Sequence, residues 1–362
     1  MYPGVDLPAT RNHPVVNTTS RSPVRTVVAL LAAVCCGCAA QPAAGPPDQA
    51  AAQLPAASSA APPSSPAPPD PAAVGANELG QVPILMYHRL VERTSSVYDR
   101  TPAAFRAELE RLAAEGYVPV TTAEYATGRI DLPAGAHPVV LTFDDGDATQ
   151  FALGPDGRPA PGTAIAILLD VAARHPGFRP VASLYVNAGP FASPDGAALR
   201  WLRGHGFEIG NHTRDHTNLA AADDRGVQEA IASGQREIQQ ALPDYPVASL
   251  ALPFGAIPAN GALALRGGVE GTSYEYACVL MVGAGPAPSP FAADFDPALT
   301  PRIRSQDPTG EDARYGSTVW LDQLAAAPEQ RYTSDGVPDR ISYPASSGLT
   351  PAPRFADRAV AY

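Results

Sequence analysis

The strongest constraint on the fold is a repeated alternation of short apolar segments with helical segments between residues 81 and 325. The apolar runs at 81–87 and 139–143 predict buried strands. Thr101 and Pro102 form a helix start, and the helical spacing that follows ends at Gly116. Further strands are expected at 182–186, 207–209, 248–252, 278–282 and 302–304, and further helices at 165–173, 199–203, 225–241 and 318–325. This order predicts a parallel α/β architecture, for which a barrel is the natural closed form.

Charge and composition exclude several classes of function. The chain of 362 residues has a net charge of −11, and its 25 basic residues are all Arg. Without Lys, a Schiff-base enzyme, a pyridoxal phosphate enzyme and a phosphate-binding P-loop are excluded. An acidic chain without a concentrated basic face also disfavours a nucleic-acid partner. We expect a monomer.

The N-terminal region is predicted to direct export. Arg21 and Arg25 precede an apolar run at 26–37, which is too short to span a bilayer but suits a signal peptide at residues 1–38. Cys38 follows a small residue, which resembles a lipoprotein cleavage site and would place a lipid there. A membrane-anchored lipoprotein is thus one expectation, and ordinary cleavage with free secretion is the other.

The next segment, 39–75, is rich in Ala and Pro and is predicted to be a disordered linker. The folded catalytic or binding domain is then expected at 76–362. Within it, Cys278 lies in an apolar run and is interpreted as a buried strand residue rather than a nucleophile. His137 lies beside a proline in a predicted loop, where solvated surface is expected. Residues 334–336 and the tail beyond Tyr343 are also predicted to be loops.

Polar residues that could carry chemistry follow the predicted strands, where active sites of such folds gather. They are His88, Asp144, Asp145, His212, His216 and the segment 253–255. Histidines four residues apart share one face of a helical turn and could bind one metal ion. Two imidazoles and one carboxylate form a three-ligand site that leaves room for water, and a second carboxylate could act as the base.

The motifs Thr142-Phe-Asp-Asp-Gly146, His212-Thr-Arg-Asp-His216 and Leu252-Pro-Phe-Gly255 together resemble those of the polysaccharide deacetylases, the NodB-homology or carbohydrate esterase 4 family. The resemblance covers residues 82–303. It implies a distorted (β/α) barrel and a metal-dependent hydrolase that removes N-acetyl groups from a polysaccharide, with zinc as the expected divalent metal.

The resemblance also implies residue roles. Asp144 matches the catalytic base, and the metal ligands would be Asp145, His212 and His216. A backbone N–H near Phe254 would stabilise the oxyanion, and there Phe in place of the usual Tyr is harmless.

The sequence departs from the family pattern at two places. Ala251 stands where the family has an Arg that orients the base, and Arg302 or Arg304 could supply that charge instead. The usual late histidine acid is also missing. His88 is the best remaining general acid, and its early position resembles the exported poly-N-acetylglucosamine deacetylases, in which the motifs are circularly permuted.

Two alternatives remain open at this point. The missing Arg at Ala251 favours a tethered carbohydrate-binding module that has lost turnover. A metal-dependent O-acetyl esterase would use the same residues on a different bond. The sequence does not distinguish peptidoglycan, an exopolysaccharide or chitin-like oligomers as the substrate.

Overall fold

The computed structural model describes residues 69–283, 285–310 and 312–362. The predicted signal peptide with Cys38, and the predicted linker up to residue 68, lie outside the described residues and stay predictions. Residues 71–75 form hydrogen-bonded turns, in which the Ala76 N–H donates to the Pro71 carbonyl at 2.9 Å. No helix in the described part of the chain is long and apolar enough to cross a membrane.

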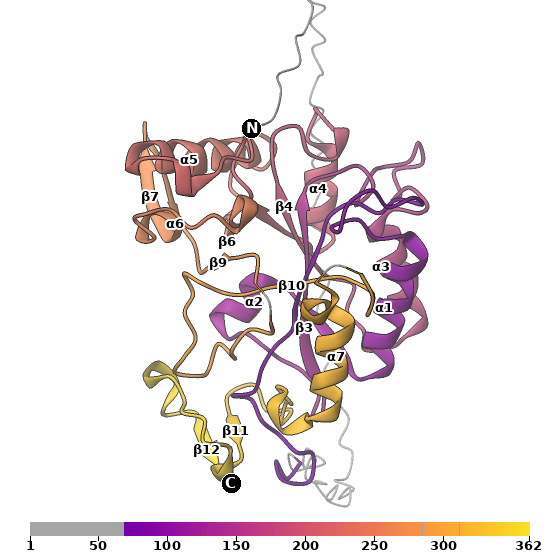
Figure 1. Cartoon of the computed structure of the whole chain (residues 1–362), viewed down its shortest axis with the longest axis vertical. Helices are drawn as coiled ribbons and strands as arrows, with labels where there is room; N and C mark the ends of the chain where they lie inside the picture. Colours follow the sequence, from indigo (N-terminus) through magenta and orange to yellow (C-terminus); the bar gives the residue numbers. More distant parts are fainter. Residues whose placement is uncertain (1–68, 284, 311) are drawn as a thin grey trace, which may run out of the picture. The chain divides into compact units, whose positions relative to one another are not determined.

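The centre of the fold is a parallel sheet of eight strands (Figure 1). The strand order is β10-β1-β3-β4-β5-β6-β9, and β2 pairs with β3 beside this path. The strands are β1 (Ile84–Tyr87), β2 (Tyr117–Val120), β3 (His137–Asp145), β4 (Ser183–Val186), β5 (Glu208–Asn211), β6 (Ser249–Ala251), β9 (Cys278–Leu280) and β10 (Ile303–Arg304). All strand pairs in this sheet are parallel, as the alternation predicted.

The segment that leads into β10 closes the sheet. Thr300 forms a parallel bridge with Leu280 of β9, and Ile303 pairs with Leu85 of β1. The two ends of the strand order are therefore connected through five residues of chain, 300–304. The predicted distorted (β/α) barrel is confirmed, and its last strand, β10, has only two residues.

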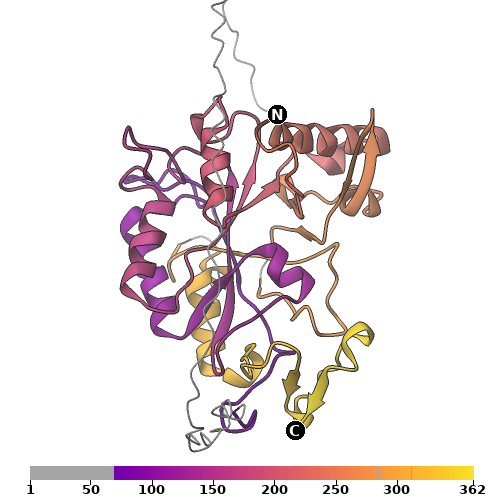
Figure 2. The ribbon, with the colours of Figure 1, turned by 180° about the vertical axis from the view of Figure 1, so that it is seen from behind.

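The helices cover the outside of the sheet. They are α1 (Pro102–Ala114), α2 (Thr122–Thr127), α3 (Ala164–Arg174), α4 (Ala197–Gly204), α5 (Asp224–Ala241), α6 (Ala262–Leu265) and α7 (Ser317–Ala326). Figures 1 and 2 show α1 and α3 side by side on one flank of the sheet. At the start of α1, Thr101 accepts a hydrogen bond from the Ala104 N–H and Pro102 occupies the first turn, as predicted.

Alternation along the strands divides the buried residues between two apolar clusters. Leu141 and Phe143 of β3 pack outward with the helices, whereas Val140 belongs to the second, inner cluster with Tyr185 of β4. Asp144 has the same parity as Val140. The strand therefore directs the Asp144 side chain into the barrel and the next one, Asp145, to the rim.

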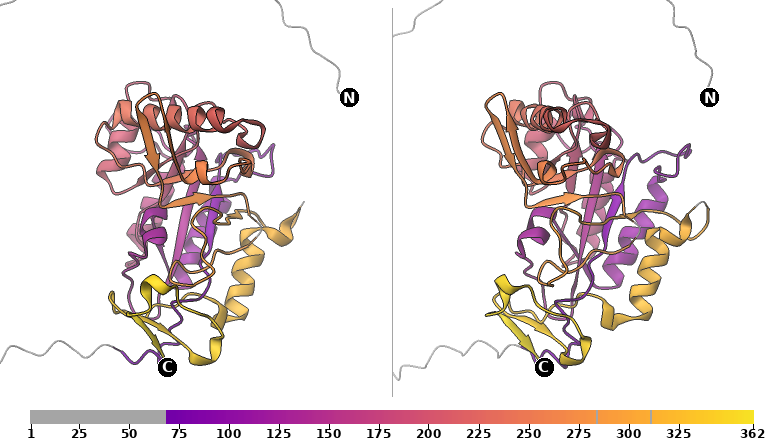
Figure 3. Two further views of the ribbon diagram at one scale, coloured as in Figure 1. Left: turned by 90° about the vertical axis from the view of Figure 1, so that its left-hand side faces the viewer. Right: turned by 60° about the vertical axis from the view of Figure 1, so that its left-hand side comes forward.

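Several elements were not predicted. The strand β2 contains Pro119, which argues against a strand but is tolerated where β2 pairs only with β3. An antiparallel hairpin, β7 (Arg266–Val269) and β8 (Thr272–Glu275), lies against α5 (Figure 3). The prediction that the tail beyond Tyr343 is only loop is wrong, because β11 (Ile341–Tyr343) pairs in parallel with β12 (Ala359–Ala361).

His137 is buried, although the sequence predicted that it would be exposed. His137 begins β3 and is buried, and its Nδ1 lies 2.9 Å from the Tyr332 carbonyl oxygen, so the prediction of a solvated surface residue is wrong. Burial lowers the pKa of His137 to about 4. Cys278 was predicted correctly, since it is a buried free thiol in β9.

Candidate active site

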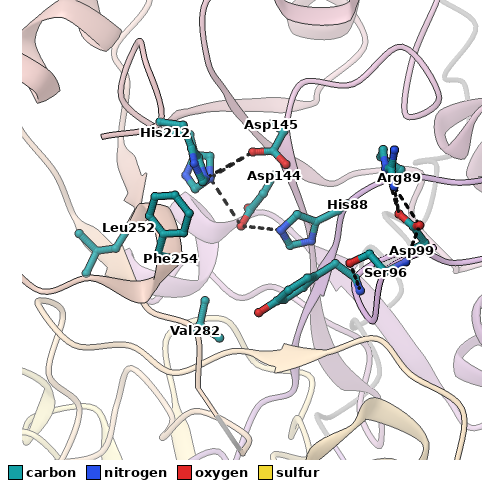
Figure 4. Close-up of a pocket in the computed structure, with 12 residues that line it drawn as sticks. His88, Arg89, Ser96, Asp99, Asp144, Asp145, His212, Leu252, Phe254 and Val282 are labelled. Carbon is teal, nitrogen blue, oxygen red and sulfur yellow. Dashed lines mark hydrogen bonds and ion pairs between the residues drawn. The ribbon is translucent and has the colours of Figure 1, made fainter. Parts of the chain in front are cut away.

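The predicted site residues meet at one pocket at the carboxyl ends of the strands. The pocket has a volume of about 280 Å³. It is lined by His88, Asp144, Asp145, His212, His216 and Phe254, and also by Arg89, Ser96, Tyr98, Asp99, Leu252 and Val282. Figure 4 shows His88, Asp144, Asp145 and His212 converging on one point from different segments. Parallel strands bring their carboxyl ends to one edge, which is why residues so distant in sequence meet here.

Asp144 is held by an arginine inside the barrel. Both Arg302 terminal nitrogens donate to it, Nη1 to Oδ1 and Nη2 to Oδ2, each at 2.7 Å. Arg302 is fully buried, and its Nε donates to the Met281 carbonyl at 2.9 Å. Burial by itself would raise the pKa of Asp144, but the charge of Arg302 outweighs it and holds that pKa well below its usual range. Asp144 is therefore a carboxylate at neutral pH.

Arg302, and not Arg304, supplies a charge to Asp144 where Ala251 cannot. Of the two candidates, Arg302 contacts Asp144, whereas Arg304 donates to Gln306 and lies over the ring of Tyr98. A bidentate pair fixes the plane of the carboxylate as well as its charge. In this chain the guanidinium that contacts Asp144 therefore comes from Arg302, the residue directly before β10.

Three side chains form a group that could hold a metal ion: Asp145, His212 and His216. The Nε2 atoms of His212 and His216 lie 3.6 Å and 3.7 Å from Asp145 Oδ1. Ligands about 2.1 Å from a tetrahedral ion are separated by about 3.4 Å, so these spacings fit one ion. His212 Nδ1 lies 2.8 Å from the Ala251 carbonyl oxygen, which orients the ring and leaves Nε2 free for a metal.

The expectation that His212 and His216 share a face of a helical turn is wrong. No helix is present between β5 and the short turn at Leu219–Ala221. Instead Thr213 and His216 have left-handed backbone, with φ of 55° and 49°, and this loop brings the two rings to 4.9 Å. Asn211 Oδ1 accepts the Thr213 N–H, and Thr213 Oγ1 accepts the Thr217 N–H, so hydrogen bonds hold the loop in this conformation.

Phe254 lies at the mouth of the pocket. Its backbone is also left-handed, with φ of 58°, and the residue is 65% exposed. The ring packs edge-on against His216 at 4.3 Å between centroids. Because strained backbone persists only where the surroundings hold it, the coincidence of positive φ at Asp145, His216 and Phe254 is typical of a functional site.

His88 faces the other side of Asp144. Its Nε2 lies 3.9 Å from Asp144 Oδ2, and its ring packs against Tyr98 at 4.8 Å between centroids. Burial is the main cause that lowers the pKa of His88, and the nearby Asp144 and Asp145 partly oppose it. Tyr98 was missed by the sequence reasoning. It lies in the loop between β1 and α1, and a tyrosine in a loop gives no signal that it will lie against a catalytic histidine.

The comparison with known sequences agrees with this site. Residues 131–267 match the polysaccharide deacetylase family. A chitooligosaccharide deacetylase from Sinorhizobium fredii is 32% identical over 121 residues, which cover 33% of this chain and 48% of that protein. The chain is therefore similar to the polysaccharide deacetylases over this part of its length. It spans about half the length of this curated relative.

Solved structures of deacetylases are also similar. The Streptococcus pyogenes deacetylase PplD in complex with acetate has a TM-score of 0.47 and 20% identity, and the match covers 62% of this chain and 92% of that one. IcaB from Ammonifex degensii has a TM-score of 0.47 and 20% identity, with 68% of this chain and 97% of that chain covered.

Proposed function

We propose that this chain is an exported, metal-dependent hydrolase that removes N-acetyl groups from an N-acetylated polysaccharide of the cell surface or its surroundings. The observation that carries the proposal is the pocket in which the Arg302-bound carboxylate of Asp144 lies between the group of Asp145, His212 and His216 and the ring of His88. A base, a metal-ligand set and a candidate acid around one space are what amide hydrolysis requires.

The three ligand side chains fit a divalent metal, and zinc is the ion that we propose. An imidazole pair with one carboxylate is a known donor set for catalytic zinc, and it leaves a coordination position open. A metal held there would supply Lewis-acid stabilisation of the charge that develops on the acetamide oxygen.

The chain's own residues would move the protons. Asp144 is ionised, so it would accept the proton of the attacking water while Arg302 holds it in orientation. The backbone N–H near Phe254 would donate to the developing oxyanion. His88, on the opposite side of Asp144, would donate a proton to the departing amine, which leaves poorly as an anion. The products would be acetate and a free amino sugar.

The tethered carbohydrate-binding module is the weaker alternative. Its main support was the lack of an Arg at position 251, and Arg302 now provides a guanidinium on Asp144. A binding protein has no need for a buried, doubly hydrogen-bonded base beside a metal-ligand set. The O-acetyl esterase differs from our proposal only in the bond cleaved, so substrates must distinguish them.

Acetate release is the experiment that tests the proposal. The metal-loaded protein is incubated with N-acetylglucosamine oligomers and, separately, with an O-acetylated polysaccharide that lacks N-acetyl groups. We expect acetate and new primary amines from the first substrate. Acetate from the second alone would favour the esterase. Binding of the oligomers without acetate from either substrate would favour the binding module.

Arg302→Ala is expected to change the pH profile as well as the rate. Because Arg302 holds the pKa of Asp144 low, its removal raises that pKa, and the acidic limb of kcat/KM moves to higher pH. Turnover at neutral pH should fall by on the order of 10²-fold, since the base also loses its orientation. Steady-state rates from pH 4 to pH 9 measure both effects.

Two variants make this prediction specific. Arg302→Lys keeps a positive charge without the bidentate geometry, so its acidic limb should stay closer to that of the wild type while its rate is low. Arg304→Ala should leave the acidic limb in place, because Arg304 contacts Gln306 and Tyr98 rather than Asp144. Unchanged turnover and pH profile in Arg302→Ala would refute the orienting role.

A further inference from the structure

Gln150 forms hydrogen bonds to the backbone of both His88, the proposed acid, and Asp144, the proposed base. It lies in the loop after β3 and is fully buried. Its Nε2 donates to the backbone carbonyl of His88 at 3.1 Å and also to the backbone carbonyl of Asp144. Carbonyl oxygens only accept, so the group that faces them must be the amide NH₂. One side chain therefore uses both of its donors on the residues that carry the candidate acid and base.

The buried amide of Gln150 lowers the stability of the fold, which indicates that it is kept for another reason. Among the described residues, the Gln150 Oε1 is buried and has no hydrogen-bond partner. A buried acceptor without a partner is destabilising, so an apolar side chain of the same size would fill this space at a lower cost in stability. The backbone of Gln150 is itself fixed, because its N–H donates to Asp147 and its carbonyl accepts from Ile165 at the start of α3. The side chain is thus a rigid anchor.

His88 depends on this anchor more than Asp144 does. Asp144 pairs with Tyr185 inside the sheet and has two hydrogen bonds to Arg302. His88 follows the last residue of β1, and its ring Nδ1 is buried without a hydrogen-bond partner among the described residues. The Tyr98 ring packs against the His88 ring, and the hydrogen bond from Gln150 holds the backbone from which that ring extends. The neighbouring Thr149 Oγ1 accepts the Leu90 N–H, which ties the same stretch to the same loop.

We propose that Gln150 is a positioning residue that fixes His88 at its working distance from Asp144, so that proton donation to the leaving amine depends on it. The proposal rests on the deacetylase function and on His88 as its acid. Gln150 itself touches neither the pocket nor the substrate, since it is not among the pocket-lining residues.

The test compares two substrates on one preparation of the metal-loaded full chain. An N-acetylglucosamine oligomer needs a proton on its leaving amine, whereas 4-nitrophenyl acetate releases a phenolate that needs none. A misplaced acid should slow only the first reaction. In Gln150→Met, which keeps length and volume but has no donor, we expect the ratio of ester to amide kcat/KM to rise by on the order of 10-fold to 100-fold. The ratio does not depend on the folded fraction, because both substrates report on the same molecules.

Further variants complete the design. Gln150→Asn retains the amide but is shorter by one methylene, and should raise the ratio too, which keeps the test available if Gln150→Met folds poorly. His88→Ala sets the largest rise that loss of the acid can give. Asn77→Leu is the matched control, because Asn77 is equally buried, also donates to a backbone carbonyl and also has an unpartnered Oδ1, but lies against the 329–333 segment. It should lower the melting temperature without changing the ratio.

The outcomes are distinct. The positioning role would be overturned if the ratio of ester to amide kcat/KM is unchanged in both Gln150 variants, whether the two rates stay the same or fall equally. A wild-type protein that releases no acetate from the oligomer, or a His88→Ala variant with an unchanged ratio, would refute the deacetylase proposal or its choice of acid, and the role of Gln150 with it.

Discussion

Asp144→Asn is expected to lower acetate release by on the order of 10³-fold while the protein keeps its metal. The amide has nearly the shape of the carboxylate but cannot accept the proton of the attacking water. Asp145, His212 and His216, the proposed ligands, are untouched by the change. The measurements are acetate release under saturating substrate and metal content per chain. Loss of metal together with activity would instead make Asp144 a ligand.

The same substitution has a stability cost that can be separated from catalysis. It leaves the fully buried guanidinium of Arg302 without a counter-ion, which costs about 3–5 kcal/mol. A double variant, Asp144→Asn/Arg302→Met, removes both charges, and its urea midpoint should recover most of the loss. Its activity should not recover. Recovery of both would mean that the single variant is inactive because it unfolds and not because it lacks a base.

His212→Ala/His216→Ala is expected to lose the metal, from about one equivalent of a divalent transition metal in the parent to almost none. Two of the three ligands are removed, and Asp145 alone, half exposed at the rim, cannot retain an ion at low concentration. Metal analysis after dialysis measures this, and far-UV circular dichroism checks the fold. Acetate release should fall below detection in parallel.

The control for this result is a histidine outside the pocket. His205 stacks on Trp201 at the end of α4, so His205→Ala should keep the metal. If the parent binds no metal even after reconstitution with zinc or cobalt, the metal-dependent mechanism fails. The binding-module alternative would then be preferred.

Much of the fold was predictable because its signals are local. The buried strands around 139–143 and 182–186 are continuous apolar runs between turn residues, and α1 has its cap and proline in adjacent positions. The strand β2 and the hairpin β7–β8 were missed, since β2 carries a proline and the hairpin is rich in glycine. The pairing of β2 with β3 is a tertiary contact that overrides weak propensity, whereas β7 and β8 pair locally through the left-handed turn at Glu270 and Gly271.

Some residues of the candidate site could also be predicted from the sequence, and others could not. Asp144, Asp145, His212 and His216 were found because they form compact motifs at the ends of predicted strands, and they do meet in one pocket. His88 was placed by its position after the first strand. The helical turn expected for His212 and His216 was wrong, because a loop with left-handed residues can bring two rings together as well as a helix can. Gln150 gave no signal, since a polar residue in a loop has no periodic pattern to mark it.

The local sequence was enough to find the acids and histidines of the candidate site, because they occur in short motifs at the ends of predicted strands. The choice between Arg302 and Arg304 could be made only from the three-dimensional contacts, in which Arg302 alone of the two donates to Asp144. Arg302 directly precedes β10 and is fully buried against Asp144, whereas Arg304 at the end of β10 is partly exposed and donates to Gln306. The physical reason is that a strand specifies alternation from local sequence, whereas register and depth are set by pairing with strands hundreds of residues away.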